Sequence, residues 1–236
     1  IDSTEISENH PPYIIAEISG NHDLSIDKAL KLIDSAKENG ASAVKIQTFT
    51  PDCLTLNTNK NQFKLASGTW KGLNLYELYQ RTNTPFEWHE KLFERAKSIG
   101  ITLFSSPFSF HSLKFLLKFN PPAFKIASNE LHDWALVKKI AEQHKPIIMS
   151  TGVANIDELK KTIEIIRSYK NNEIIILHCI SSYPALSNDA NIKTISSLKS
   201  QFNVITGFSD HTLNSTASCT AIAFGACVIE KHFTLD

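Results

Sequence analysis

Short runs of β-branched and apolar residues alternate along this chain with longer segments in which apolar residues recur every three to four positions. The longer segments have the periodicity of amphipathic helices, and the short runs have the length of strands. In 25–39, for example, Ile26, Leu30 and Ile33 mark one face of a helix, and Gly40 follows as a stop. The pattern predicts eight strands: Tyr13–Ser19, Ala43–Thr48, Thr102–Ser106, Ala123–Ala127, Pro146–Ser150, Glu173–Cys179, Asn203–Phe208 and Ala226–Lys231.

Strict alternation of buried strands and helices predicts a parallel sheet. Eight strands in 236 residues favour an α/β fold closed into a (β/α)8 TIM barrel, with one catalytic domain over residues 1–236. The alternative is an open, doubly wound sheet, but its G-x-G-x-x-G turn is missing, since Gly20 stands alone after the first strand. The sequence ends at Asp236, directly after the eighth strand, so we expect a barrel truncated before its last helix.

One long segment, Pro51–Pro85, shows no clear element. Connections of this length are usually functional or disordered. Trp70, Tyr76 and Tyr79 lie in it, and such aromatic content is untypical of a floppy linker. The segment is therefore predicted to be a partly helical lid over a site.

Composition narrows the classes of partner. The chain has 24 Lys and Arg against 24 Asp and Glu, so its formal net charge is zero. A surface that binds nucleic acid or anionic membrane would need clustered excess positive charge. No apolar run approaches the roughly 20 residues of a membrane helix. The sequence thus predicts a protein that binds neither nucleic acid nor membrane. A local basic site for a small anion is still compatible with zero net charge.

The four cysteines, at positions 53, 179, 219 and 227, form no C-x-x-C pair. Three of them, Cys179, Cys219 and Cys227, lie in apolar runs. Small buried thiols in a reducing compartment explain this usage better than a disulfide framework does. The polar, acidic start of the chain is unlike a signal peptide. Both features favour a cytoplasmic enzyme.

Charged residues recur on one parity of the predicted strands, that is, on one of the two alternating sets of positions along each strand. In the first strand Ala16 and Ile18 alternate with Glu17, and in the second Val44 and Ile46 alternate with Lys45. Because side chains alternate in direction along a strand, one parity faces the helices and the other faces into the barrel. Catalytic residues of such barrels lie at the carboxyl ends of the strands. The inward set predicted in this way is Glu17, Lys45, Lys125, His178, His211, Glu230 and His232.

Two histidines of this set lie at neighbouring strand ends. His211 and His232 could bring two imidazoles to one divalent metal and leave open positions, as catalytic sites require. The alternative is one general-base histidine and one structural histidine. Glu230 could orient one of these ligand histidines without itself binding the metal.

The two lysines indicate an anion site. Lys45 and Lys125 are suited to a phosphate or carboxylate, and serine hydroxyls at the strand ends would add donors, although several of those serines could instead cap helices. Glu17 is a candidate general acid or base, or an ion-pair partner of Lys45. A different chemistry stays open, in which Lys125 or Lys45 is the Schiff-base nucleophile of a class I aldolase.

Six ordered blocks along nearly the whole chain resemble the sialic acid synthase (NeuB-type) family. They are Ile14–His22 (IIAEISGNH), Val44–Thr48 (VKIQT), Phe124–Ser128 (FKIAS), Ser150–Gly152 (STG), Gly207–Thr212 (GFSDHT) and Glu230–Asp236 (EKHFTLD). Within the family, the AEISGNH block and the segment Gly68–His89 resemble pseudaminic acid synthases, whereas N-acetylneuraminate and legionaminate synthases more often read AEAGVNH at the first block.

The resemblance implies an enzyme that condenses phosphoenolpyruvate with an open-chain N-acylated amino-hexose and releases phosphate. It implies a divalent metal, typically Mn2+ with Mg2+ or Co2+ as alternatives, held by His211 and His232 to polarise the sugar aldehyde. It implies catalytic roles for Glu17, Lys45 and Lys125. The residues expected to bind the substrates are Gln47, Ser106, Ser128, Ser150, Ser181, Tyr183, Ser209 and Asp210, with Tyr183 and Asp210 at the sugar.

The chain also departs from the family pattern. Neuraminate enzymes carry Asn at the position of Ser181 and Thr at the position of Ser106. Family members continue through an eighth helix and a small antifreeze-like (SAF) domain, which this sequence does not contain. In the domain-swapped homodimers of the family, that domain supplies an arginine to the partner's sugar site. A non-enzymatic barrel retained for sugar binding is a further alternative, against which the intact charged set argues.

Overall fold

The computed structural model describes residues 1–66 and 70–235 as a closed barrel of parallel strands, as the sequence predicts. Each strand pairs with its neighbours in chain order, and the first and last strands close the ring. The strands are β1 (Tyr13–Glu17), β2 (Ala43–Thr48), β3 (Thr102–Pro107), β4 (Phe124–Ile126), β5 (Ile147–Ser150), β6 (Ile174–Cys179), β7 (Ile205–Asp210) and β8 (Val228–His232).

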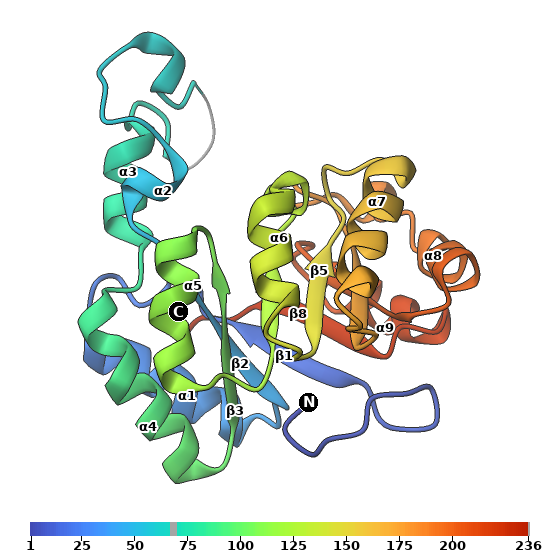
Figure 1. Cartoon of the computed structure of the whole chain (residues 1–236). Coiled ribbons are helices and arrows are strands. Elements are labelled where there is room, and N and C mark those ends of the chain that lie inside the picture. Colours follow the sequence, from blue (N-terminus) through green and yellow to red (C-terminus); the bar gives the residue numbers. More distant parts are fainter. Residues whose placement is uncertain (67–69, 236) are drawn as a thin grey trace.

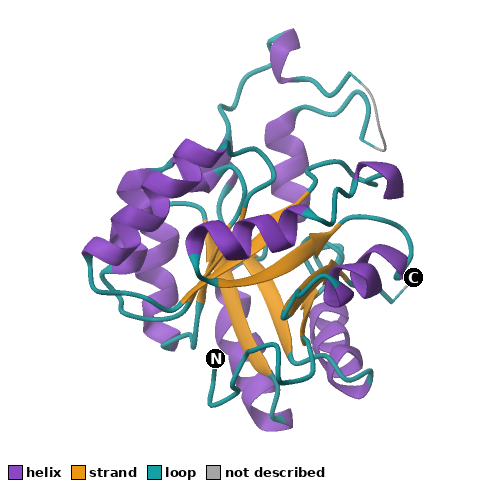
Figure 2. Ribbon diagram, turned by 90° about the vertical axis from the view of Figure 1, so that its right-hand side faces the viewer, coloured by secondary structure: helices purple, strands orange, loops and turns teal. Residues whose placement is uncertain are grey.

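Helices cover the outside of this barrel (Figures 1 and 2). Each buries one apolar face against the strands, which is the packing that parallel sheets require. Those that follow successive strands are α1 (Ile26–Glu38), α4 (His89–Ile99), α5 (Phe110–Leu116), α6 (Trp134–Ala141), α7 (Ile156–Ser168), α8 (Thr194–Phe202) and α9 (Thr216–Ala223).

Local chemistry sets where several of these helices begin and end. The Ser25 side chain caps α1 at the amide of Lys28. Asn155 and Glu158 form a reciprocal capping box at the start of α7. At the end of α4, Gly100 has a positive φ of 68°, a left-handed conformation that glycine adopts without strain.

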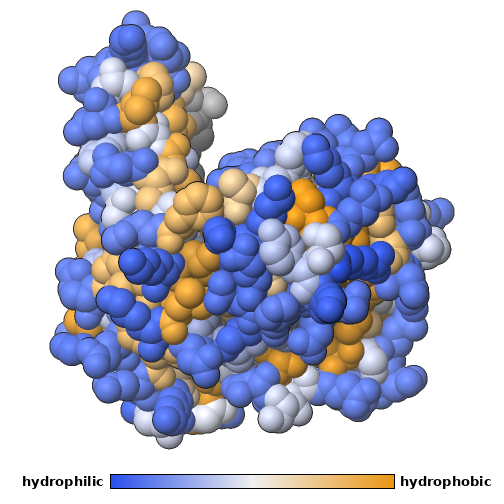
Figure 3. All heavy atoms as spheres, viewed as in Figure 1, coloured by the Kyte–Doolittle hydropathy of each residue, from blue (hydrophilic) through white to orange (hydrophobic). Residues whose placement is uncertain are grey.

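The segment between β2 and α4 forms an arm that projects from one side of the barrel (Figure 1). It contains the short helix α2 (Pro51–Leu54), the 3-10 turn η1 (Asn61–Phe63) and the helix α3 (Leu75–Thr82). The prediction of partial helix is confirmed. In the space-filling view the arm rises clear of the barrel body, and its role as a lid stays a prediction (Figure 3). Residues 67–69 of the predicted lid, the Gly68 end of the resembling segment and Asp236 lie outside the described residues.

The described cysteines are all free thiols, as expected from their spacing. Cys179 and Cys227 are buried and Cys53 is half-buried. The prediction was wrong for Cys219, which lies exposed on α9 because that helix buries the face made by Ala217, Ser218 and Ala221 instead. Within the described ranges, no helix combines the length and apolar character that a bilayer crossing demands.

Candidate active site at the barrel mouth

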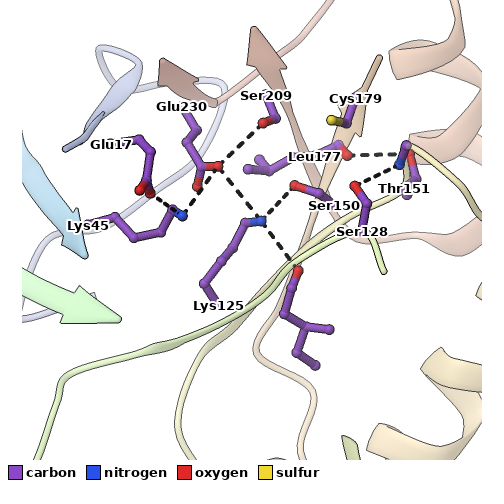
Figure 4. A network of polar contacts seen from close by, with 12 residues as sticks. Glu17, Lys45, Lys125, Ser128, Ser150, Thr151, Leu177, Cys179, Ser209 and Glu230 are labelled. Atoms are coloured by element: carbon purple, nitrogen blue, oxygen red, sulfur yellow. Dashed lines mark hydrogen bonds and ion pairs between the residues drawn. The ribbon is translucent and has the colours of Figure 1, made fainter. Parts of the chain in front are cut away.

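Four charged side chains meet inside the carboxyl end of the barrel (Figure 4). Glu17, Lys45, Lys125 and Glu230 come from β1, β2, β4 and β8, and each is at most 6% exposed. Lys45 forms an ion pair with Glu17, and its Nζ lies 3.8 Å from Glu230 Oε1. Lys125 Nζ lies 3.7 Å from the same oxygen. The four charges balance, so the site exists without a net charge in the core.

Burial and the facing charges shift the pKa values of this group. Burial raises the pKa of Glu17, against the opposing effect of Lys45. Burial also lowers the pKa of Lys125. Burial alone would raise the pKa of Glu230, but Lys125 and Lys45 hold it below its usual value. Perturbed pKa values of this kind are typical of functional sites, although buried ion pairs show them too.

Beside Lys125 lies a cradle of hydroxyl groups. Lys125 Nζ donates to Ser150 Oγ at 2.7 Å, and the amide of Gly152 donates to Ser128 Oγ at 3.1 Å. A side chain at Gly152 would overlap Ser181 Oγ and lie 2.9 Å from Ser128 Oγ. The glycine therefore keeps space open beside the hydroxyls of Ser128 and Ser181, while Ser150 contacts the buried ammonium group. Hydroxyl and ammonium donors of this kind suit an oxyanion.

Several buried oxygens in the mouth have no hydrogen-bond partner within the described part of the chain, among them Ser106 Oγ and Glu230 Oε2. A polar atom left unpaired in the interior is costly, so these atoms are placed for a ligand or water. Ser209 Oγ donates to the other oxygen of Glu230 at 3.3 Å. Gln47 is half-buried two residues beyond Lys45, on the same side of β2.

The two predicted metal ligands lie side by side at the rim. The ring centroids of His211 and His232 are 5.3 Å apart, and the ring of Tyr183 packs against both, tilted to His211 at 4.2 Å and edge-to-face with His232 at 5.7 Å. His211 Nδ1 donates to the carbonyl of Ile180 at 2.7 Å. That bond places the ring proton on Nδ1 and leaves Nε2 as the coordinating atom, the arrangement usual for metal-bound histidine.

This pair fits a divalent ion with two protein ligands. Desolvation and the neighbouring His211 lower the pKa of His232 to about 4, so its imidazole is neutral near pH 7. Hydrogen bonds with Cys179 and Ile180 raise the pKa of His211 against the opposing effect of burial. No third His, Cys, Asp or Glu completes a cluster with them in the described ranges, so further ligands would have to be substrate or water.

Three predicted positions differ from expectation. His178 faces the helices rather than the mouth, because its Nε2 donates to the carbonyl of Ala190 at 2.8 Å and its ring stacks on Phe208. Asp210 also points away from the mouth, toward Ser218 and Lys231, and so does not reach a sugar there. Glu230 lies between the two lysines instead of behind a histidine.

The inward set also contains two residues that parity did not identify. Cys179 occupies the inward position of β6, 3.9 Å from His211 Nδ1. Glu130 follows β4 in the 3-10 turn η4 (Glu130–His132), and its Oε2 is buried without a hydrogen-bond partner. Burial raises the pKa of Glu130, and Lys125 and Lys45 are near enough to oppose that shift. An isolated acid in a loop carries no periodic signal, but its position just after an inward lysine could have pointed to it.

The fold and this mouth define a (β/α)8 barrel in which two buried lysines and several serines lie beside a histidine pair. The model of the NeuB family matches residues 32–236, and the chain belongs to that family. It is 50% identical over 224 residues to the pseudaminic acid synthase of Campylobacter jejuni, covering 95% of this chain and 65% of that protein. It is 44% identical over 226 residues to the pseudaminic acid synthase of Helicobacter pylori, covering 96% of this chain and 66% of the relative. The chain thus spans slightly less than two thirds of the length of these relatives.

Solved structures show the same architecture. The crystal structure of N-acetylneuraminic acid synthetase from Leptospira borgpetersenii, in complex with citrate, superposes with a TM-score of 0.89 at 30% identity, covering 100% of this chain and 78% of that chain. A phospho-2-dehydro-3-deoxyheptonate aldolase from Thermotoga maritima has a TM-score of 0.73 at 16% identity, covering 98% of this chain and 62% of that chain, and shares the fold alone.

Proposed function

We propose that this barrel condenses phosphoenolpyruvate with the open-chain aldehyde of an N-acylated amino-hexose. The methylene carbon of phosphoenolpyruvate forms the new carbon–carbon bond with the aldehyde carbon, whose oxygen takes up a proton. Water adds to the carbon that carries the phosphate, the carbon–oxygen bond breaks, and phosphate leaves a 2-keto acid sugar. The observation that carries the proposal is the pair of buried lysines, Lys45 and Lys125, with the serine cradle beside a histidine pair.

Each residue of the mouth has a role in this reaction. Lys125 and the hydroxyls of Ser128 and Ser150 would hold the phosphate, and Lys45 would hold the carboxylate of the same molecule. Ser106, Ser181, Ser209 and Gln47 supply further donors. Glu17, whose pKa burial raises, is suited to carry a proton between water and the reacting atoms.

His211 and His232 would hold a divalent ion, Mn2+ in our proposal, which when bound would polarise the sugar aldehyde. Tyr183 packs against both rings and is 63% exposed, so it can form a wall for the sugar above them. Glu130, which lies near the two lysines, offers an acceptor for a sugar hydroxyl or amide.

We propose pseudaminic acid synthesis in particular, because relatives of that name are 44–50% identical to the chain. An N,N'-diacetyllegionaminic acid synthase of Campylobacter jejuni is 38% identical, so legionaminate synthesis is the nearest alternative. We further propose a cytoplasmic enzyme whose longer form is a domain-swapped homodimer, in which the partner completes the sugar site.

Release of phosphate from phosphoenolpyruvate tests the proposal. We expect release with Mn2+ and one member of a panel of N-acylated amino-hexoses, measured on this chain and on a form extended to the length of its relatives. Release with a legionaminate precursor alone would replace the sugar assignment. Absence of release from both forms with every sugar, while phosphoenolpyruvate still binds, would contradict the synthase and favour a binding module.

The class I aldolase alternative gives a distinct result. Borohydride with pyruvate would label Lys125 or Lys45 if the barrel formed a Schiff base. EDTA should reversibly stop phosphate release by the proposed enzyme. Full activity in EDTA together with a borohydride-labelled lysine would establish the alternative.

A further inference from the structure

Two charged residues link β7 to β8 on the helix-facing side of the histidine pair. In the register of these strands, Asp210 lies opposite Lys231. Lys231 Nζ forms an ion pair with Asp210 Oδ2 at 2.9 Å and donates to the carbonyl of Thr212 at 2.6 Å. Side chains alternate in direction along a strand, so the residue that follows each of these two, His211 or His232, points into the mouth.

The carboxylate of Asp210 holds three elements together. Its Oδ1 accepts from the amide and the hydroxyl of Thr212, each at 2.8 Å. Its Oδ2 accepts from Ser218 Oγ of α9 at 2.5 Å and from Lys231 of β8. Asp210 is 1% exposed, and these four donors together compensate its charge in the interior. The turn that carries His211 is thereby fixed to the neighbouring strand and helix.

The backbone of each histidine is held on both sides. His211 lies between Asp210 and Thr212, and Lys231 contacts both of those residues. His232 follows Lys231 directly, and the amide of Phe233 next to it donates to the carbonyl of Glu17 at 2.9 Å. In the described structure neither ring nitrogen of His232 forms a hydrogen bond, so the strand on which it sits is what positions its ring.

We propose that Asp210 and Lys231 are positioning residues that set the separation of His211 and His232, and with it the affinity of this pair for a divalent cation. The inference rests on the metal role given to the pair under the proposed function. The competing view is that the ion pair only stabilises the barrel. The two views differ in what Lys231→Met should do, because Asp210 keeps its bonds to Thr212 and Ser218 in that variant and the fold should persist.

Mn2+ binding measured by calorimetry separates these views. We expect Lys231→Met to weaken Mn2+ binding about tenfold, which corresponds to about 1.4 kcal/mol. Lys231→Arg should restore most of the affinity, since guanidinium can bridge the same two oxygens. A matched control is Arg95→Met, which removes the ion pair that links α4 to Asp34 of α1, with nitrogen–oxygen distances of 2.6 and 2.9 Å. It should leave Mn2+ affinity unchanged.

Crystal structures of the wild type and of Lys231→Met provide the readout that needs no metal. We expect the His211–His232 ring separation to depart from 5.3 Å, or residues 211–212 to lose their single conformation, in the variant. Unchanged rings would overturn the positioning role, as would Mn2+ affinity equal to that of the wild type. If His211→Ala binds Mn2+ as the wild type does, the metal assignment of the proposed function fails, and these two structures alone decide the positioning role.

Discussion

The barrel interior has a lower half, at the amino ends of the strands, and an upper half, at their carboxyl ends. The same strands build both halves, and yet the two differ in chemistry. In the lower half Tyr13, Ile15, Phe104 and Ile148 fill the interior, and Ile6 from the N-terminal segment covers the end. Two residues further along the same faces, Glu17 follows Ile15, Ser106 follows Phe104 and Ser150 follows Ile148. The apolar half stabilises the fold. Burying the polar half costs desolvation free energy, which the pairing of the charges offsets in part and which is consistent with a role in binding a ligand.

The largest expected effect on stability is in the lower half. Phe104 is fully buried in the interior cluster. Phe104→Ala should lower the free energy of unfolding by about 3–5 kcal/mol, because it removes apolar contacts and leaves a cavity. Urea denaturation checks this value. A loss below about 1 kcal/mol would mean that the lower half is not the structural core of the barrel.

The complementary change is in the upper half. Lys125→Met should weaken phosphoenolpyruvate binding by about 2–5 kcal/mol, because the bound anion would lose its buried partner. Lys125→Met should also destabilise the fold, because the buried carboxylate of Glu230 then keeps only Lys45 as a charged partner, but this loss should be smaller than in Phe104→Ala.

The control lies at the opposite end of the barrel. Lys145 precedes β5, and its Nζ donates to Asn120 Oδ1 and the carbonyl of Pro121, both at 2.6 Å. Lys145→Met should leave phosphoenolpyruvate affinity unchanged in calorimetry. Equal losses in the two variants would remove the distinction between the two halves.

A buried group outside the mouth gives a pH test. Burial lowers the pKa of His89 to about 4, and its ring is held neutral between Thr48 and the carbonyl of Pro85. The unfolded chain binds a proton near pH 6.5, so this group's contribution to stability is complete above that pH and is lost as pH falls toward 4. The loss is on the order of 3 kcal/mol by 1.36 kcal/mol per pKa unit. The free energy of unfolding of the wild type and of His89→Gln, measured over this pH range, isolates the contribution of His89. Parallel pH profiles of the two proteins would refute a lowered pKa of His89.

The smallest expected effect is in the cradle. Gly152→Ala places a methyl group against Ser181 Oγ and Ser128 Oγ. Because Ser181 is exposed and can move, stability should change by less than about 1 kcal/mol, while phosphoenolpyruvate affinity should fall about tenfold. Calorimetric titration with phosphoenolpyruvate measures this. Undiminished affinity would place the anion elsewhere in the mouth.

The fold and much of the site could be predicted from the sequence because parity is visible where one face of a strand is polar. Glu17 and Lys45 alternate with apolar neighbours, and the structure places both inside. In β6 the run Ile174–Leu177 is apolar on both faces, so it gives no parity, and His178 was assigned to the wrong side. Asp210 has the outward parity of its strand, and only the family resemblance had suggested a sugar contact.

Loop residues escape this reasoning for a physical reason. Glu130 lies in a turn, where side chains have no fixed period, so its approach to the lysines required three-dimensional structure. The arm between β2 and α4 has helical segments that the sequence could indicate, but its direction depends on packing at its base, where Phe49 contacts Tyr79 and Phe108.

A crystal structure of the chain with Mn2+ and phosphoenolpyruvate tests the central claim most directly. The account predicts a manganese anomalous peak within coordinating distance of His211 and His232, and phosphoenolpyruvate within hydrogen-bond distance of Lys45 and Lys125. Manganese bound away from the two histidines, or phosphoenolpyruvate bound outside the barrel mouth, would contradict it.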